Sequence, residues 1–179
     1  MSQVSLSRSY GAANPPAKLP MDKVVAWLGD PAYRLSRMLR DMPDFSALRH
    51  VSLSVHETAT DMLWAFACSD PQGGAPEVHE IEMVNAPSLS LMVGTVESRI
   101  IDNLAEFGAS SHYQATGSRS SECRSCMTVP IHQDGEFLGF VIFGAAVPGF
   151  FVPPARDVLE TYAEAFAILI SRAIDEVTA

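Results

Sequence analysis

The residues Cys123–Gly144 constrain the fold of this chain more than any other stretch. Two apolar runs flank Gln133-Asp134-Gly135-Glu136, and Asp-Gly between apolar runs favours a type I′ hairpin turn. The second run, Phe137–Gly144, contains no polar side chain. A strand with one solvated face alternates between polar and apolar residues, so this strand is expected to be covered on both faces. The sequence therefore predicts a central hairpin with a helical layer behind it and a lid over a cavity in front.

Length, composition and charge indicate one globular domain that does not bind nucleic acid. The chain has 179 residues, of which 47% are apolar and 18% charged, enough for a self-sufficient core. Its net charge of −9 leaves no basic surplus for phosphate backbones. Residues 1–50 nevertheless carry seven Lys and Arg against four Asp and Glu, and the rest of the chain carries five against seventeen. This asymmetry suggests docking to a second copy or to a partner.

The sequence is typical of a cytoplasmic protein. Residues 2–10 are polar and unlike a signal peptide, and three cysteines suit a reducing compartment without structural disulfides. The longest uncharged stretch, residues 137–155, is interrupted by Gly139, Pro148 and Pro153. It is therefore not expected to cross a membrane.

The terminal regions are predicted to be helical. After a flexible arm over residues 1–20, Met21–Leu28 forms a short helix that Gly29 ends. A second helix is expected to begin at Asp30 as its cap, with Pro31 at its first position. Its three arginines, Arg34, Arg37 and Arg40, line one face, which is either solvated or a seam to an acidic partner such as the last helix of a second copy. That last helix begins at Pro153-Pro154, and it carries a long apolar stripe of Val158, Leu159, Tyr162, Phe166, Leu169, Ala173 and Val177.

Between these helices the pattern predicts strands and one long loop. His50–His56 alternates as a half-buried strand, Met62–Cys68 is apolar on both faces, and Val78–Val84 is expected at an edge of the sheet. Residues 88–107 predict a short helix followed by an extended piece at Arg99–Leu104. Residues 108–122 are Ser-rich and without regular pattern, which is typical of a lid or binding loop.

The order of these motifs resembles the GAF domain family over roughly residues 30–175. The residues that carry the resemblance are Ser125, Val129, Pro130, Gly135, Leu138, Gly139, Gly149 and Phe150, with Val96–Leu104 upstream. The resemblance implies an α+β fold with a central antiparallel sheet, the N- and C-terminal helices on one face and a lidded ligand pocket on the other. It also implies a small-molecule sensor that forms a homodimer through its terminal helices and signals to a partner in trans.

The resemblance places the ligand on one side of the hairpin. Cys126 and Thr128 share that face of an alternating strand, and hairpin pairing can bring Phe140, Ile142 and Gly144 to the same face. The small or polar side chains at 126, 128 and 144 leave room for a ligand. Arg99 and Asp102 stand where the lid segment meets the pocket, and Arg99 can bind a carboxylate or phosphate bidentately. The alternative for these two residues is a surface ion pair.

Cys123 and Cys126 form the one motif that could carry covalent or metal chemistry. The C-x-x-C spacing permits a redox couple or two metal ligands, although only His112 and His132 lie nearby in sequence as further ligands. Two unconnected thiols are the simpler interpretation. The GAF family includes free methionine-R-sulfoxide reductases, but the cysteines here do not stand at the positions of that pattern, so no enzymatic activity is expected.

The sequence leaves the ligand, and any cofactor, unidentified. A cyclic nucleotide, an amino acid, haem, a nitrate-like anion and a 2-oxo acid all remain open. It contains no G-x-x-x-x-G-K phosphate loop and no H-E-x-x-H motif. A domain with a filled pocket that serves only for dimerisation is a further alternative.

Overall fold

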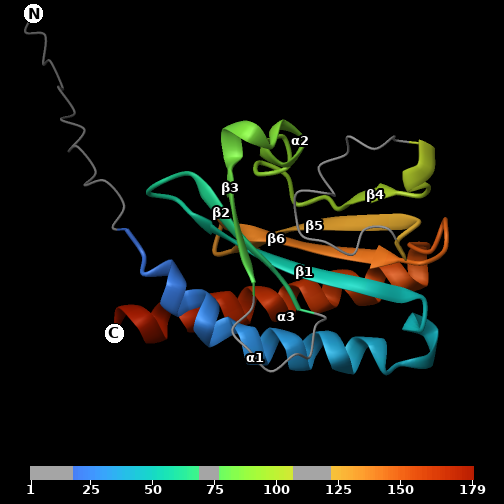
Figure 1. Ribbon diagram of the computed structural model, residues 1–179, viewed down its shortest axis with the longest axis horizontal. Helices are drawn as coiled ribbons and strands as arrows, with labels where there is room; N and C mark the ends of the chain where they lie inside the picture. The colour runs from blue at the N-terminus through green and yellow to red at the C-terminus, as the bar shows by residue number, and fades with distance from the viewer. Residues whose placement is uncertain (1–17, 69–76, 107–121) are drawn as a thin grey trace, which may run out of the picture.

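A six-stranded antiparallel sheet forms the middle layer of the molecule (Figure 1). The computed structural model describes residues 18–68, 77–106 and 122–179. The strand order is β3-β2-β1-β6-β5-β4. The strands are β1 (Leu48–Glu57), β2 (Met62–Ala67), β3 (Val78–Glu82), β4 (Arg99–Ile101), β5 (Ser125–Gln133) and β6 (Glu136–Ala145). The N-terminal arm and the 108–122 loop fall almost wholly outside the described residues.

Both long helices cover the same face of the sheet (Figure 1). These helices are α1 (Met21–Arg40) and α3 (Pro153–Thr178). The stripe predicted for the last helix is confirmed, because Leu159, Phe166 and Ala173 are fully buried in the core and its other members pack against that core partly buried. Ile170, which the predicted stripe does not include, is fully buried as well. The α+β fold with the terminal helices on one face is therefore as expected.

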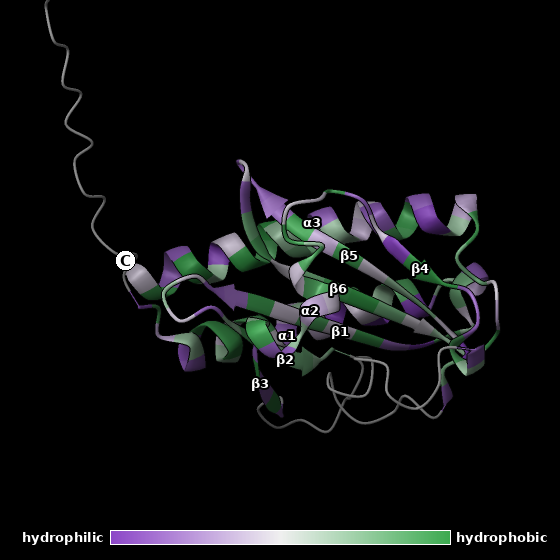
Figure 2. Ribbon diagram, turned by 90° about the horizontal axis from the view of Figure 1, so that it is seen from above, coloured by the Kyte–Doolittle hydropathy of each residue, from purple (hydrophilic) through white to green (hydrophobic). Residues whose placement is uncertain are grey.

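The central position of β6 confirms the prediction for the hairpin. β6 lies between β1 and β5, and Figure 2 shows it mostly in the hydrophobic colour. Val141 and Phe143 pack in the core with the helices, whereas Phe140 and Ile142 lie on the opposite face, and none of the four is more than 5% exposed. The turn has positive φ at Asp134 (52°) and Gly135 (84°), as a type I′ turn requires.

The prediction of two N-terminal helices is wrong, because α1 continues through Gly29 and Pro31. Asp30 does not cap a helix but forms an ion pair of 2.8 Å with Arg34, one turn further on. Proline removes one hydrogen bond from a helix interior, yet Leu28 and Ala32 on either side of it are completely buried. The packing of this helix face outweighs the local signal to stop.

The prediction of a half-buried β1 is wrong as well. His50, Ser52 and Ser54 are only 4%, 2% and 5% exposed. They alternate with the buried apolar residues Val51, Leu53 and Val55, so both faces of β1 are covered. Burial of polar groups is costly unless they find partners, which makes this row of β1 a feature that needs explanation.

The remaining elements follow the sequence pattern with shorter bounds. β3 is an edge strand as expected. The helix predicted near residue 88 is only the short α2 (Pro87–Ser90), preceded by the 3-10 turn η2 (Met83–Asn85). Arg99–Ile101 is extended as β4 and forms the opposite edge. Two further 3-10 turns, η1 (Pro43–Phe45) and η3 (Leu104–Glu106), lie in connections.

Candidate functional site

The face of the sheet opposite α1 and α3 carries an apolar cluster at one end. Leu63 and Phe140 from the sheet pack against Met83, Leu89 and Met92 from residues 83–92, which we call the η2–α2 segment. The rings of Phe137 and Phe140 meet edge to face at 4.8 Å between centroids. Phe140, expected among the ligand-binding residues, is therefore completely buried in this cluster.

Next to the apolar cluster, four neighbouring strands bring small and polar side chains together. The strand register pairs Arg99 with Thr128, Thr128 with Ile142, and Ile142 with Ser52. The adjacent row pairs Cys126 with Gly144, and Gly144 with His50. Residues paired directly across strands point to the same side of a sheet. We call this set the central patch: Arg99, Cys126, Thr128, Ile142, Gly144, His50 and Ser52.

The central patch contains most of the residues that the sequence predicts for the site. Cys126, Thr128, Ile142, Gly144 and Arg99 meet there as expected. The sequence reasoning missed His50 and Ser52. Their signal is the polar half of an alternating strand, which reads as a solvated face unless the central position of that strand is known.

Burial keeps His50 and Cys126 of the central patch neutral. It lowers the pKa of His50 from 6.5 to about 4, because a buried imidazolium loses its hydration. It raises the pKa of Cys126 to about 11, against the opposing effect of the Arg99 charge, and the neighbouring Cys123 adds to the rise. At neutral pH the patch therefore presents an imidazole, a thiol and the hydroxyls of Ser52 and Thr128, all uncharged.

Arg99 brings the positive charge to this site. Its side chain reaches from β4 to α2, where Nη1 donates a hydrogen bond of 3.2 Å to the carbonyl oxygen of Ser88. Two polar groups at this contact are buried without a hydrogen-bond partner among the described residues: the Nε of Arg99 and the hydroxyl of Ser88. Buried donors without acceptors are uncommon in folded proteins.

Asp102 lies apart from Arg99. Its side chain is exposed, and its carbonyl oxygen accepts a hydrogen bond of 2.9 Å from the backbone N–H of Gly149. The ion pairs within the described part of the chain include none between Arg99 and Asp102. The surface pair considered from the sequence is thus not formed, and the guanidinium turns toward α2.

The cysteines show no built metal centre. All three are buried and reduced, and His132 bonds with the carbonyl oxygen of Val93 at 3.0 Å. Within residues 18–68, 77–106 and 122–179, His, Cys, Asp and Glu side chains form no group of three that could hold a metal ion. The thiolate is the reactive form of cysteine, and the raised pKa of Cys126 disfavours that form.

β4 is connected to the start of α3. The Ser98 hydroxyl donates a hydrogen bond of 2.7 Å to the carboxylate of Glu160, and Arg156 Nε donates one of 2.9 Å to the same oxygen. Burial acts to raise the pKa of Glu160, but the hydrogen bonds from Arg156 and Ser98 outweigh it and hold that pKa below its ordinary value. The contact between Asp102 and Gly149 adds a second connection between β4 and the approach to α3.

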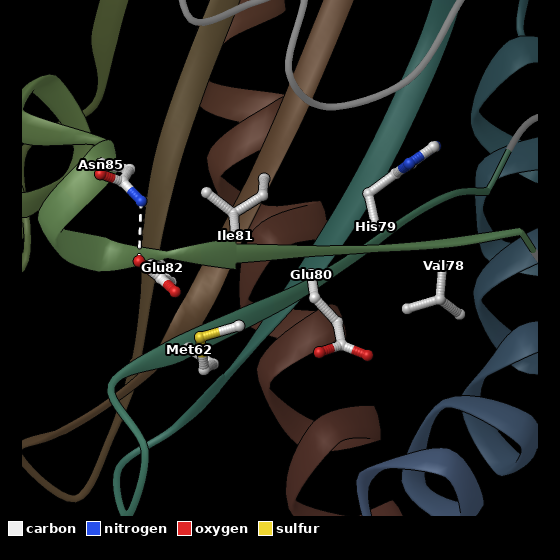
Figure 3. A pocket seen from close by; sticks show the side chains of 7 residues that line it. All are labelled: Met62, Val78, His79, Glu80, Ile81, Glu82 and Asn85. Atoms are coloured by element: carbon white, nitrogen blue, oxygen red, sulfur yellow. Dashed lines mark hydrogen bonds between the residues drawn. The ribbon is translucent and has the colours of Figure 1, made fainter.

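A hollow of about 590 Å³ lies along the edge strand β3. Figure 3 shows that its lining side chains project from opposite sides of the strand, with His79 and Ile81 on one side and Glu80 on the other. The hollow therefore follows the outer border of the sheet, away from the central patch in strand order.

The comparisons with known proteins agree with this architecture. The family model of the GAF domain matches residues 19–173, so the chain belongs to the GAF domain family. No curated protein matches the chain. No helix in the described residues combines the length and the apolar character of a membrane span.

Solved structures share the fold at low sequence identity. A methyl-accepting chemotaxis protein aligns with a TM-score of 0.58 at 13% identity, covering 82% of this chain and 90% of that one. A type II free methionine-R-sulfoxide reductase from Thermoplasma acidophilum aligns at 0.55 and 13%, covering 84% and 97%. The GAF domain of a two-component sensor histidine kinase from Bacillus halodurans aligns at 0.52 and 12%, covering 80% and 92%. At these identities the likeness concerns the fold alone.

Proposed function

We propose that this GAF domain is a cytoplasmic sensory module that binds a small molecule on the central patch. Occupancy of the patch alters α3, and the domain signals to a partner in trans as a homodimer formed through its terminal helices. The observation that carries the proposal is the row of buried polar side chains on the face of the sheet opposite α1 and α3.

The two faces of the sheet differ in a way that supports a binding role. The helix face presents large apolar side chains such as Met127, Val129 and Phe143. On the other face His50, Ser52 and Thr128 are at most 4% exposed, although apolar residues there would be less costly to bury. Pockets for small molecules combine apolar walls with a few converging polar groups of this kind. The names of two structural neighbours, a chemotaxis protein and a sensor kinase, suit such a role.

The connections of β4 supply a route from ligand to helix. Arg99 stands in the central patch, and the preceding residue, Ser98, is hydrogen-bonded to Glu160 of α3. A ligand that binds one arrangement of β4 and α3 better than another shifts the population toward that arrangement. A ligand with equal affinity for the two arrangements would not shift their populations. We therefore expect the ligand to contact β4 itself.

Native mass spectrometry of the purified full chain tests the proposal. We expect the protein to retain a small molecule, and Thr128→Met, which adds volume within the central patch, to lose it. Thr58→Met is the matched control, because Thr58 is exposed in the turn between β1 and β2. A molecule retained equally by both variants would place binding elsewhere.

Methionine-sulfoxide reduction is a second candidate, favoured by the proximity of Cys123 to Cys126. In such a reaction two thiols would become a disulfide while the sulfoxide becomes a sulfide and water. Because burial disfavours the Cys126 thiolate, we expect no turnover of free methionine-R-sulfoxide with dithiothreitol as reductant. Turnover that disappears in Cys126→Ser would establish the enzyme instead of the sensor.

A further inference from the structure

We infer that the central patch binds a small molecule with a single carboxylate and no ammonium group, and that Arg99 anchors the carboxylate. The inference rests on the proposed function and names its ligand class. It is carried by the charges and the unpartnered donors around Arg99.

Within the described residues, Arg99 is the charged side chain of the central patch. The neighbouring His50 and Cys126 are neutral at pH 7, because burial lowers the pKa of the former and raises that of the latter. Arg99 is half-buried, and its one hydrogen bond in this part of the chain goes to an uncharged carbonyl oxygen. The patch therefore has a net positive charge of one.

Two donors at this place lack an acceptor. Arg99 Nε and the Ser88 hydroxyl are both enclosed without a partner, and the two residues are in contact through Nη1 and the Ser88 carbonyl oxygen. A carboxylate accepts several hydrogen bonds and matches the geometry of a guanidinium. We therefore expect the bound carboxylate to accept hydrogen bonds from both groups.

Within the described residues, no carboxylate of the chain forms an ion pair with Arg99. The acidic residues that flank β4, Glu97 and Asp102, are both exposed, and neither forms an ion pair with Arg99 in the described structure. The sequence from residue 107 to residue 121 contains no Asp or Glu. The counter-charge is therefore expected to come from the ligand.

The same charge count selects among anionic ligands. A phosphate with two negative charges would leave one of them uncompensated by Arg99 in this largely buried place, which is costly. An α-ammonium group calls for a carboxylate or a cluster of acceptors, whereas the patch contributes a positive charge, which repels it. A monocarboxylate whose remaining atoms are uncharged fits the hydroxyls and the imidazole of Thr128, Ser52 and His50.

Thermal-shift assays and calorimetric titration of the ligand-free full chain test the inference. The probes are pyruvate and 4-methyl-2-oxopentanoate, with L-alanine and L-leucine as partners of matched carbon skeleton, the methyl esters of both oxo acids, and inorganic phosphate. We expect at least one oxo acid to bind and its amino acid, its ester and phosphate to bind at least about tenfold more weakly, since a hydrogen-bonded charge pair contributes that much or more.

Variants assign the effect to Arg99. Arg99→Gln is expected to weaken oxo-acid binding about tenfold or more, Arg99→Lys to retain part of it, and Ser88→Ala to weaken it less. Arg124→Gln is the control, because Arg124 is exposed and should bind as the unaltered chain does. Circular dichroism shows whether each variant folds, and Arg99→Lys remains informative if Arg99→Gln does not.

Three results would overturn the inference: no binding by either oxo acid, equal binding of the matched amino acid or ester, or equal binding by folded Arg99→Gln. The proposed function is tested separately by the retained molecule. If the retained compound is neutral, cationic or dianionic and Thr128→Met releases it, the proposed sensor function stands and only the inference of a carboxylate ligand fails. If no molecule is retained and no probe binds, both fail.

Discussion

At the scale of single residues, Gly139 fixes the approach of β6 to β1. A Cβ at this position would lie 1.9 Å from the carbonyl oxygen of Ser54, and φ is +148°. The Ser54 hydroxyl in turn bonds with the backbone N–H and carbonyl of Phe140, both at 3.2 Å. β1 and β6, two of the four strands of the central patch, are thus held by a contact that only glycine permits.

Gly139→Ala should therefore lower the free energy of unfolding by about 3 kcal/mol or more, the sum expected from overpacking and backbone strain. Urea denaturation followed by circular dichroism measures it. Gly94→Ala is the control, because a Cβ there meets no atom within 4 Å and should change the stability little. A loss in Gly139→Ala as small as in the control would contradict the close approach.

His50 makes the stability depend on pH. Its pKa falls from 6.5 in the unfolded chain to about 4 in the folded protein, so the unfolded chain binds the proton first as the pH drops. Stability is present above pH 6.5 and is lost between pH 6.5 and pH 4, by about 3 kcal/mol for this group.

The measurement is the unfolding free energy at about pH 7 and about pH 4.5 for the unaltered chain and for His50→Gln. Carboxylates titrate in both proteins, so the difference isolates the imidazole. We expect the unaltered chain to lose about 2 to 3 kcal/mol more than the variant. Equal losses would mean that His50 is charged, or solvated, in the folded state.

At the scale of elements, a variant that breaks the connection between β4 and α3 is expected to separate ligand binding from signalling. Glu160→Ala removes the acceptor of Ser98 and Arg156 but no group of the central patch. We expect ligand affinity to stay within about twofold, and stability to fall by less than about 1 kcal/mol because the ion pair is partly exposed.

Amide hydrogen exchange with and without ligand measures the coupling between the central patch and α3, in the unaltered chain and in Glu160→Ala. In the unaltered chain, the ligand should change the exchange rates of the first turns of α3, and the variant should lose this change. Glu164→Ala, an exposed residue of the same helix, should keep it. A ligand effect on α3 that survives in Glu160→Ala would point to another route.

The elements show how far sequence reasoning reaches. The hairpin was predictable because its turn and its strand composition agree. Asp134-Gly135 favours the positive φ of a type I′ turn, and a strand without polar side chains is expected to be buried on both faces. The continuity of α1 was not predictable. Burial of Leu28 and Ala32 in the core is a tertiary effect, which the local signals at Gly29 and Pro31 do not reveal.

The site was partly predictable for the same reason. Period-two alternation placed Cys126 with Thr128 on one face, and hairpin pairing added Ile142 and Gly144. The contribution of β1 depended on strand order, which alternation does not encode. The Arg99–Ser88 contact joins segments without strong periodicity, so only the structure could show it.

At the scale of the whole molecule, the outer sides of α1 and α3 carry the features of an interface. Met38 and Ile168 are large apolar side chains that are 62% and 61% exposed. The arginines considered as a seam are partly occupied within α1, since Arg34 pairs with Asp30 and Arg37 with Asp41. An apolar contact between helices is therefore the expected basis of the homodimer that we propose.

Sedimentation velocity of Met38→Glu and Ile168→Glu tests this interface. We expect both to shift the protein from dimer to monomer by at least about tenfold in dissociation constant, because a buried charge opposes association. Leu91→Glu is the control, since Leu91 is 81% exposed and lies outside both helices. Dimer loss in the control alone would place the interface at the η2–α2 segment.

A crystal structure of the protein as purified, with any retained small molecule, tests the central claim most directly. The claim predicts ligand density over the central patch, between Arg99 and the side chains of Thr128 and His50. A patch filled by side chains of the protein itself, with no room between them and Arg99, would contradict the claim and leave a domain that serves only for dimerisation.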